Sequence, residues 1–536
     1  MPTSPLKPLE RPYLPIIYVR GYAGSDAEVD GTVADPYMGF NVGATVVRQD
    51  WEGVVHRHYF ESPLVRLMKD HEYRDVYHVG EEMPLGERLS PRSVFIYRYY
   101  DDVSNLLGAG ERRDIEDFAE GLGALILRVR ERICEDGEYD PDTFGVHLVA
   151  HSMGGLICRS FLQNPRPAVA ETVKMVDKVF TYATPHNGID LQVLGNIPGL
   201  FSRNNADNFN RRRMAEYLGL PPDRSRDDVA TLNGRFDPDR FFCLVGTNAD
   251  DYKTVSGWAQ RVVGPLSDGL VRITNATVHG SWTKNGKAVE MQAPRAFVYR
   301  SHSGPLGIVN SEDGYQNLTR FLFGDVRVDG VLLIKELSLP PKVQEAHDAG
   351  QRIRASYHFD VIVRVRRARW ELHRRLLREN SAVFRKFSDL FPKPGSGRAV
   401  HHPHLFSAYL ALWGRKRRGV TLGFSIDLGV HVPEYEIDRR IFMDEYYPGG
   451  MLYRDKINFE LSPPRGDRAD WKLRWGSDRT TPNRTEHPLE PIEGSEVAEA
   501  LPGFVEEGDQ FYSVPVRQDS QPGIDAQLVL RARPWR

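Results

Sequence analysis

Short apolar runs alternate with amphipathic segments over the first 325 residues of the chain. Runs of strand composition, rich in Val, Ile, Phe and Tyr, occupy residues 14–19, 93–99, 144–149, 177–183, 240–247 and 296–300. Apolar residues within 115–133, 156–162 and 313–324 instead recur at steps of three and four, which is typical of amphipathic helices. Strands that alternate with helices predict an α/β fold with a mostly parallel sheet and helices on both faces.

The pattern changes after Asp325. Short segments of strand composition, several of them alternating apolar and polar residues, lie at 358–365, 405–412, 420–426, 456–461, 471–475 and 527–532. Gly, Pro and Asp fill the gaps, which is typical of a β-sandwich. A chain of 536 residues also exceeds what one hydrophobic core normally serves. We therefore predict an α/β domain over residues 1–325 and an all-β, sandwich-like domain over 326–536.

Two segments of the first domain are too long to be simple connections. Residues 189–239 begin apolar and end polar, and they leave the sheet at the carboxyl end of a strand, where such sheets bind ligands. A lid over a binding pocket and a plain surface excursion both fit this pattern, and we favour the lid. Residues 26–78 are polar and aromatic, and we expect them to form the rim of an active site.

Charge and composition narrow the classes of function. The net charge of −3 argues against a general nucleic-acid-binding protein. Three scattered cysteines provide neither a disulfide framework nor zinc-ligand spacing, and no phosphate-binding loop or dinucleotide fingerprint occurs, so we predict no metal and no cofactor. The chain shows neither a signal peptide nor an apolar run long enough to span a membrane, which predicts a cytoplasmic location. Export by machinery that reads no signal peptide is the alternative.

The stretch from Val149 to Gly155 carries the clearest chemical pattern. Ser152 stands between a predicted strand and a predicted helix, with the small residues Ala150 and Gly154 two positions before and after it. That arrangement is typical of a nucleophile elbow, the sharp turn that exposes a catalytic serine. The usual pattern has glycine at both flanking positions, so Ala150 is a departure from it.

A serine nucleophile needs a histidine base and a carboxylate that orients the histidine. In this type of fold the acid follows the serine along the chain, and Asp250, Asp251 and Asp268 all come after the strand that ends at Thr247. Asp268 lies in the sequence Ser-Asp-Gly-Leu-Val, where a tight turn and two apolar residues hold a carboxylate in place. Asp250 and Asp251 lie in a polar run, so Asp268 is the better candidate.

Two histidines compete for the role of the base. His302 directly follows the strand at 296–300, whereas His279 precedes that strand, so the position along the chain favours His302. His151 is adjacent to the serine and points elsewhere. For the oxyanion, the N–H of Met153 at the start of the elbow helix is one predicted donor. The N–H of Tyr22, in the glycine-rich turn after the first strand, is the other.

Residues 1 to about 325 resemble the α/β-hydrolase lipases. The matching motifs are Ala-His-Ser-Met-Gly-Gly at 150–155, Ala-Thr-Pro-His-Asn-Gly at 183–188 and Ser-Asp-Gly-Leu-Val at 267–271. Bacterial triacylglycerol lipases and the inositol deacylases of glycolipid anchors are similar in these motifs. The resemblance implies a triad of Ser152, Asp268 and His302 and an oxyanion pair of Tyr22 and Met153. It does not extend beyond Asp325, and Arg20 stands where many lipases have a histidine.

These features predict an enzyme, a serine carboxylic-ester hydrolase of the lipase, esterase or phospholipase type, which acts on lipid-like esters through an acyl-enzyme. The alternative is a catalytically silent α/β-hydrolase scaffold that senses a ligand or binds a membrane or protein partner. Arginines of the C-terminal domain, at 364, 366, 367, 369, 374 and 375, suggest contact with anionic lipid head groups. Alternating arginines are more often the wet face of a strand, and we favour that interpretation.

Overall fold

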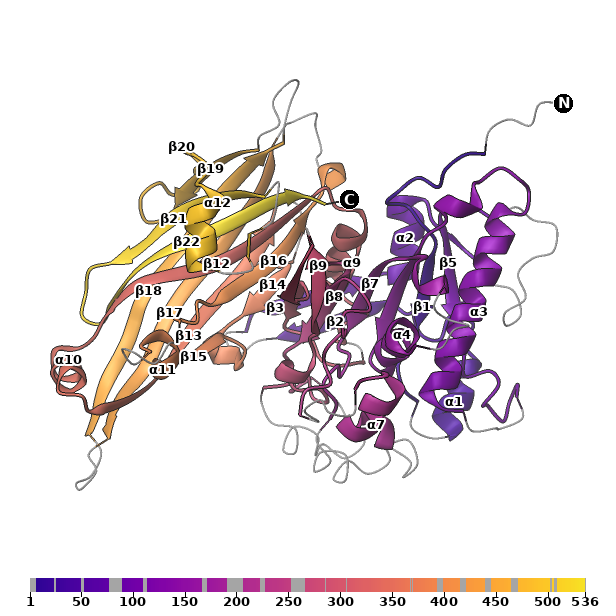
Figure 1. The fold of residues 1–536 in the computed structure, drawn as a ribbon, viewed down its shortest axis with the longest axis horizontal. Helices are drawn as coiled ribbons and strands as arrows, with labels where there is room; N and C mark the ends of the chain where they lie inside the picture. Colours follow the sequence, from indigo (N-terminus) through magenta and orange to yellow (C-terminus); the bar gives the residue numbers. More distant parts are fainter. Residues whose placement is uncertain are drawn as a thin grey trace. The chain divides into compact units, whose positions relative to one another are not determined.

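The computed structural model divides the chain into two compact units, Met1–Phe323 and Gly324–Arg536 (Figure 1). It describes residues 6–23, 26–49, 53–76, 89–108, 113–165, 171–189, 206–221, 227–251, 266–284, 286–304, 306–366, 368, 370–392, 399–414, 421–438, 445–463, 471–501, 504–505 and 509–535. Each unit has its own cluster of buried apolar side chains.

The first unit is built on a seven-stranded sheet in the order β11-β8-β7-β6-β1-β5-β4. Every neighbouring pair of strands in it is parallel. The strands are β1 (Ile16–Val19), β4 (Arg74–Asp75), β5 (Ser93–Tyr97), β6 (Val146–His151), β7 (Val176–Tyr182), β8 (Phe241–Gly246) and β11 (Arg295–Val298). All residues of β1, β7 and β8 are buried, as expected for parallel strands covered on both faces.

Helices cover both faces of this sheet. Helices α3 (Ile115–Cys134) and α4 (Met153–Gln163) pack against one face of the sheet. Their buried apolar side chains belong to the same core cluster as the strand residues that point to that face, for example Val179 of β7. The next residue, Phe180, points to the opposite face and contacts Phe321 of α9 (Glu312–Phe323) with ring centroids 6.0 Å apart. Helix α2 (Pro63–His71) joins α9 through an ion pair between Arg66 and Glu312. The predicted parallel α/β sheet is therefore confirmed.

Smaller elements decorate the first unit. Helix α1 (Asp26–Val33) and the hairpin of β2 (Ala44–Gln49) and β3 (Val55–Phe60) occupy the predicted rim segment, and β9 (His279–Lys284) pairs with β10 (Lys287–Gln292). Within the predicted lid, the structure shows the short helices η2 (Ala206–Phe209) and α7 (Arg211–Tyr217). Its apolar first part, residues 190–205, lies outside the described residues, so the lid stays a prediction.

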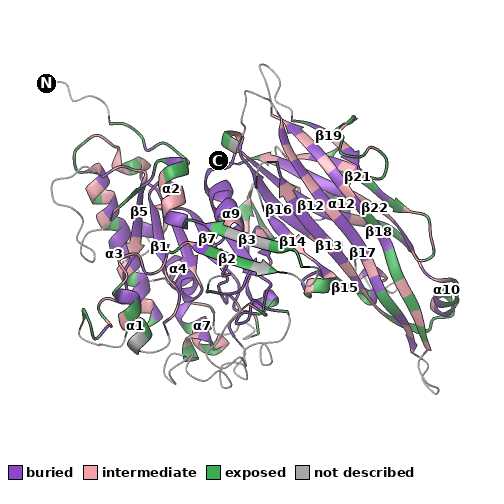
Figure 2. Cartoon of the chain, turned by 180° about the vertical axis from the view of Figure 1, so that it is seen from behind, coloured by how far each residue is buried: buried purple, intermediate pink, exposed green. Residues whose placement is uncertain are grey.

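The second unit is a β-sandwich, as predicted. One sheet has the order β16-β12-β22-β21, and the other has the order β14-β13-β17-β18-β19-β20, with β15 also paired to β13. Leu332 and Leu528 of the first sheet share a buried cluster with Phe359 and Ile426 of the second. Figure 2 shows buried stretches along the strands of both sheets. The strands are β12 (Val326–Ser338), β13 (Arg352–Val365), β14 (His373–Arg375), β15 (Val383–Lys386), β16 (His404–Leu410), β17 (Leu422–Asp438), β18 (Glu445–Ser462), β19 (Lys472–Ser477), β20 (His487–Leu489), β21 (Gln510–Gln518) and β22 (Gly523–Pro534). Short helices α10 (Pro341–Asp348), α11 (Phe387–Leu390) and α12 (Gly494–Ala500) flank them.

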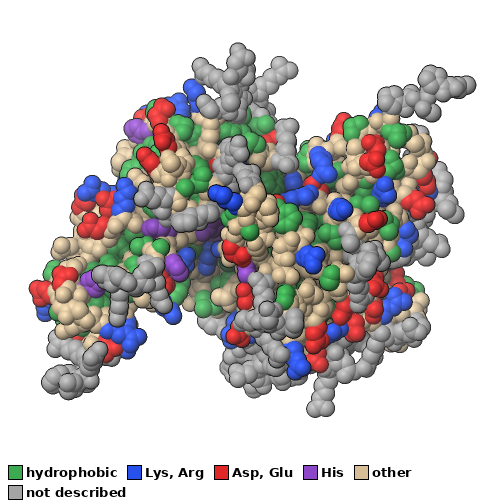
Figure 3. Space-filling view, viewed as in Figure 1, with side chains coloured by type: hydrophobic (Ala, Val, Ile, Leu, Met, Phe, Trp, Pro, Cys, Tyr) green, Lys and Arg blue, Asp and Glu red, His purple; other side chains and the backbone are tan. Residues whose placement is uncertain are grey.

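Two arginines of the predicted basic stripe in the second unit form ion pairs with carboxylates. Arg364 forms ion pairs with Asp427 and Glu371, and Arg374 binds Glu379 at 2.6 Å. Acidic and basic side chains are interspersed over the face shown in Figure 3. These ion pairs agree with a solvated strand face, and contact with a membrane surface stays a prediction. Among the described residues, no helix has the length and apolar character needed to cross a membrane.

Candidate active site

Ser152 occupies a strained turn between β6 and α4. Strand β6 ends at His151 and α4 begins at Met153, which leaves Ser152 alone at φ 52° and ψ −124°. A positive φ is unfavourable for a residue with a side chain and persists only where the surroundings enforce it. Here the Ser152 N–H donates to the carbonyl of Tyr182 at 2.9 Å, and the Thr184 hydroxyl donates to the Ser152 carbonyl at 2.8 Å. These bonds hold the turn.

Glycines allow the backbone to approach this turn closely. A Cβ on Gly154 would lie 2.3 Å from the Val19 carbonyl oxygen, and one on Gly21 would lie 2.8 Å from Cβ of Ser152. Any side chain at either position would push β1 or its following loop away from the serine. Ala150 is tolerated in place of glycine because it is an ordinary residue of strand β6 and needs no positive φ.

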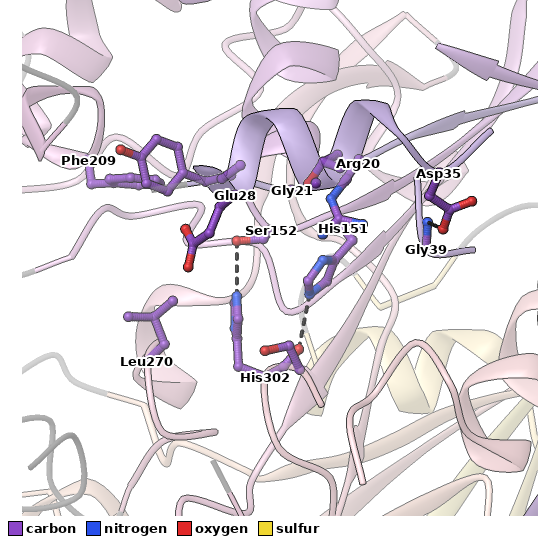
Figure 4. Close-up of a pocket in the computed structure, with 15 residues that line it drawn as sticks. Arg20, Gly21, Glu28, Asp35, Gly39, His151, Ser152, Phe209, Leu270 and His302 are labelled. Atoms are coloured by element: carbon purple, nitrogen blue, oxygen red, sulfur yellow. Dashed lines mark hydrogen bonds between the residues drawn. The ribbon is translucent and has the colours of Figure 1, made fainter. Parts of the chain in front are cut away.

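Three of the predicted residues form one chain of hydrogen bonds. His302 Nε2 lies 3.0 Å from Ser152 Oγ (Figure 4). On the other side of the ring, His302 Nδ1 lies 2.9 Å from Asp268 Oδ2. The second oxygen of Asp268 accepts the N–H groups of Leu270 and Val271 at 3.0 and 2.7 Å. In addition, the His302 N–H donates to the Asp268 carbonyl at 2.9 Å. The turn thus holds the carboxylate and the histidine in fixed relative positions.

The alternative candidates for the acid and the base contact groups away from Ser152. The Asp251 carboxylate accepts the side-chain amide of Asn248 in the turn after β8. His279 begins the β9 hairpin, and its Nδ1 and Nε2 lie 2.9 Å from Glu290 and 2.8 Å from Asp228. The structure therefore brings Asp268 and His302, and not Asp251 or His279, into the hydrogen-bond chain of the serine.

The side chain of His151 contacts the backbone of His302. Its Nε2 lies 3.0 Å from the backbone carbonyl oxygen of His302, and Figure 4 shows the ring turned away from Ser152. Burial and the neighbouring His302 hold the pKa of the His151 imidazole well below its ordinary value. A neutral His151 with its proton on Nε2 donates to the His302 carbonyl, a positioning role that the sequence pattern did not indicate.

Both predicted oxyanion donors are next to the serine. Met153 is the first residue of α4, where a backbone N–H has no acceptor within its own helix. Tyr22 follows Gly21, and both residues line the same cavity as Ser152. The Tyr99 hydroxyl donates to the carbonyl of Arg20 at 3.0 Å, and the Ala23 N–H donates to the Tyr100 hydroxyl at 2.8 Å. The loop that carries Tyr22 is thus held at both ends.

A cavity of about 470 Å³ opens beside Ser152 and His302. Helix α1 and the turn after it form one wall, with Glu28, Gly31, Thr32 and Asp35 facing the cavity. These positions are i, i+3, i+4 and i+7, which share one face of a helix, and this polar, small-residue stripe is the sequence signal that could have revealed them. Phe209 of η2 and Leu270 are apolar parts of the lining. Among the described residues, no cluster of three or more His, Cys, Asp or Glu side chains is placed to hold a metal ion.

No protein-family model and no curated protein sequence matches this chain. Among solved structures, Bacillus licheniformis lipase BlEst2 aligns in its mature form at 15% identity over 57% of this chain and 91% of that chain, with a TM-score of 0.28. Its propeptide form aligns at 11% identity over 88% and 98%, with a TM-score of 0.27. The lin2722 product of Listeria innocua aligns at 14% identity over 58% and 93%, with a TM-score of 0.25. These likenesses are too remote to support an argument about function, so the strand order and the elbow carry the fold assignment.

Proposed function

We propose that this chain, whose first unit has the α/β-hydrolase fold, is a serine hydrolase that cleaves carboxylic esters of lipid-like compounds. The observation that carries the proposal is the unbroken hydrogen-bond chain from Ser152 Oγ through His302 to Asp268. A hydroxyl is a weak nucleophile until an adjacent base accepts its proton, and this chain supplies the base and the group that orients it.

The first half of the reaction forms an acyl-enzyme. Ser152 Oγ attacks the ester carbonyl carbon while His302 Nε2 takes the hydroxyl proton. Asp268 accepts the His302 Nδ1–H, which selects the productive tautomer and stabilises the imidazolium ion. The N–H groups of Tyr22 and Met153 donate to the oxyanion of the tetrahedral intermediate. Collapse of the intermediate breaks the ester bond, and His302 returns the proton to the leaving alcohol.

The second half of the reaction releases the acid. A water molecule attacks the acyl-enzyme carbonyl, and His302 accepts a proton from it. The second tetrahedral intermediate expels Ser152 Oγ, which recovers its proton from His302. The apolar side chains of Phe209 and Leu270 support a substrate with an apolar portion, because they line the cavity in which the ester must lie.

Substitution of Ser152 by alanine tests the proposal. We expect Ser152→Ala to lower kcat for p-nitrophenyl butyrate by about 10⁵-fold or more and to abolish labelling by a fluorophosphonate probe, because His302 and Asp268 cannot attack alone. Ser303→Ala is the matched control, since Ser303 lines the same cavity and is not part of the hydrogen-bond chain. Circular dichroism checks that both variants fold. Turnover by Ser152→Ala at close to the parent rate would mean that the proposed mechanism is wrong.

A further inference from the structure

Arg20 joins the loop that lies against Ser152 to a second part of the cavity wall. This loop, residues 20–23, directly follows β1, and a Cβ on its Gly21 would lie 2.8 Å from Cβ of Ser152. The Arg20 guanidinium donates to the carbonyl of Met38, which belongs to the turn after α1. Arg20, Gly21 and Gly39 all line the cavity of Ser152 (Figure 4). One side chain therefore connects the loop beside the serine to a separate segment.

The turn after α1 is shaped to receive this guanidinium. Met38 and Gly39 both have a positive φ, of 49° and 87°. A Cβ at Gly39 would lie 2.6 Å from Nη1 of Arg20, so glycine is needed there for the close approach of the guanidinium. A positive φ at a residue such as Met38 costs free energy and persists where the surroundings enforce it. The contact between Arg20 and the Met38 carbonyl is part of those surroundings.

Other contacts anchor this turn to the rest of the first unit. The Asp35 carboxylate accepts the N–H groups of Tyr37 and Gly39 at 3.0 and 2.8 Å, one on each oxygen. Arg98, which is buried directly after β5, donates to three backbone carbonyls at 2.8–3.0 Å, those of Val33, Asp35 and Pro36. The Met38 carbonyl is therefore held in a defined place, and a side chain that binds it is held there too.

The remaining contacts hold the loop from another direction. The Tyr99 hydroxyl has one proton for two acceptors, the carbonyls of Arg20 and Gly21 at 3.0 and 3.1 Å. The Ala23 N–H donates to the Tyr100 hydroxyl at 2.8 Å. Both tyrosines belong to the segment after β5, whereas Arg20 binds the turn after α1. Without the Arg20 contact, the two tyrosines would hold the loop from one side alone.

We propose that Arg20 is a positioning residue of the oxyanion site, which fixes residues 20–23 relative to Ser152 by binding the Met38 carbonyl. This inference rests on the proposed serine-hydrolase function, in which the loop donates to the oxyanion. A donor stabilises the transition state only when it lies within hydrogen-bond distance of the place where the negative charge forms. A displaced loop therefore weakens transition-state binding more than it weakens binding of the ester itself.

Removal of the guanidinium provides the first test. Arg20→Met keeps most of the bulk, and we expect kcat for p-nitrophenyl butyrate to fall by roughly 10- to 100-fold while KM changes less than about twofold. Arg20→Lys retains one donor and the charge, so its kcat should exceed that of Arg20→Met by at least about threefold. Arg130→Met is the matched control, because Arg130 donates to the Pro141 carbonyl at 3.2 Å outside the described cavity lining. It should leave kcat unchanged.

A substitution in the turn tests the same contact from its other side. The added Cβ of Gly39→Ala displaces the guanidinium of Arg20, and we expect kcat to fall with KM nearly unchanged, as in Arg20→Met. Gly137→Ala is the matched control for backbone strain, since Gly137 also has a positive φ, of 66°, and a Cβ there would meet no atom within 4 Å. It should keep the parent kcat. Circular dichroism checks that each variant folds, and Gly39→Ala provides the test if Arg20→Met does not fold.

An inhibitor that forms an oxyanion separates positioning from a general structural effect. Ser152 Oγ adds to the carbonyl carbon of 1,1,1-trifluoroheptan-2-one, the hydroxyl proton passes to His302 Nε2, and the carbonyl oxygen becomes an oxyanion. We expect Ki for Arg20→Met to rise by the factor by which kcat/KM falls, with an unchanged number of sites after complete fluorophosphonate labelling.

Three results would overturn the positioning inference while the hydrolase proposal stands. They are an unchanged Ki, a rise of KM at unchanged kcat, and a loss of turnover that only follows the number of labelled sites. Absence of ester turnover and of fluorophosphonate labelling in the parent chain would overturn both proposals.

Discussion

At the scale of single residues, strain and hydrogen bonds position Ser152, the proposed nucleophile. The backbone of Ser152 at φ 52° costs on the order of 1–3 kcal/mol relative to an ordinary conformation. The bonds to Tyr182 and Thr184 keep it there, and the result is an Oγ that lies 3.0 Å from His302 Nε2. The same principle applies to Asp268, whose carboxylate is oriented by two backbone N–H groups before it contacts the histidine.

The acid can be identified by substitution. Asp268→Asn keeps the side chain nearly isosteric but no longer holds His302 in the productive tautomer, so we expect kcat for p-nitrophenyl butyrate to fall by about 10⁴-fold. Asp250→Asn and Asp251→Asn are the matched controls and should lower kcat less than threefold by rough estimate, because neither carboxylate joins the Ser152 chain. Activity in Asp268→Asn comparable to that of the controls would contradict the assignment.

A second pair of substitutions tests which histidine is the base. His302→Ala removes the group that accepts the serine proton, and we expect its kcat to fall as far as that of Ser152→Ala. His279→Ala should retain most activity, since its imidazole pairs with Asp228 and Glu290 in the β9 hairpin. A dead His279→Ala beside an active His302→Ala would reverse the assignment of the base.

At the scale of elements, α4 contributes more than the turn at its start. Arg159 of this helix is completely buried, and its guanidinium donates to the carbonyls of His186, Val229 and Thr231 at 2.7–2.8 Å. Its Nε donates to Gln163 at 2.9 Å. Burial lowers the pKa of Arg159 to about 10, which still leaves the guanidinium charged at neutral pH. One side chain thus ties α4 to the residues just before the predicted lid and to the C-terminal part of the lid segment.

Removal of this guanidinium should destabilise the first unit. Arg159→Met removes the donor to the carbonyls of His186 and Val229, while the Thr231 carbonyl keeps the side-chain amide of Gln163 as a donor. We expect the free energy of unfolding to fall by about 3 kcal/mol or more. Arg159→Lys should recover little of the loss, since an ammonium cannot reproduce the planar fork of donors. Arg113→Met removes an exposed ion pair with Asp102 and should cost less than about 1 kcal/mol. Urea denaturation followed by circular dichroism measures all three variants, and equal losses for Arg159→Met and Arg113→Met would contradict this role.

At the scale of the whole molecule, buried histidines couple the stability of the first unit to pH. Burial lowers the pKa of His71 and of His147 to about 4. The unfolded chain, with an ordinary histidine pKa of about 6.5, therefore binds protons before the folded chain does. Stability that is fully present above about pH 6.5 is lost as the pH falls towards 4. The loss approaches about 3 kcal/mol for a fully buried histidine.

A single substitution tests this coupling. His147 donates from Nε2 to the Pro12 carbonyl at 2.8 Å, and a glutamine amide keeps a donor at this position without the titration. We expect the melting temperature of the parent chain to fall between pH 6.5 and 5, and the fall should be shallower in His147→Gln. Differential scanning calorimetry at fixed ionic strength measures both slopes. Identical slopes would show that His147 does not contribute.

Local sequence pattern alone predicted the two architectures, and it selected most residues of the proposed site. Apolar residues that recur every two residues indicate a strand, and those that recur every three to four residues indicate a helix, with the apolar face buried. This pattern predicted a helix-covered parallel sheet followed by a β-sandwich. Ser152 was recognisable because a nucleophile elbow needs a strand, a small-residue turn and a helix in immediate succession. Asp268 and His302 could be selected because a tight turn and a strand end are also local features. The structure places both within hydrogen-bond distance of their partners.

Contacts between distant segments were decided only by the tertiary structure. Strand β12 carries Arg327 and Asp329 among its apolar residues, so its sequence pattern does not predict a strand buried in the core. Both side chains are nonetheless buried, because Asp329 pairs with Arg327 and with Arg531 of the neighbouring β22. Glu28 and Phe209 likewise meet at one cavity from segments far apart in the chain. Periodicity shows which side of an element is covered, but the partners that neutralise a buried charge or share a cavity depend on packing over the whole fold.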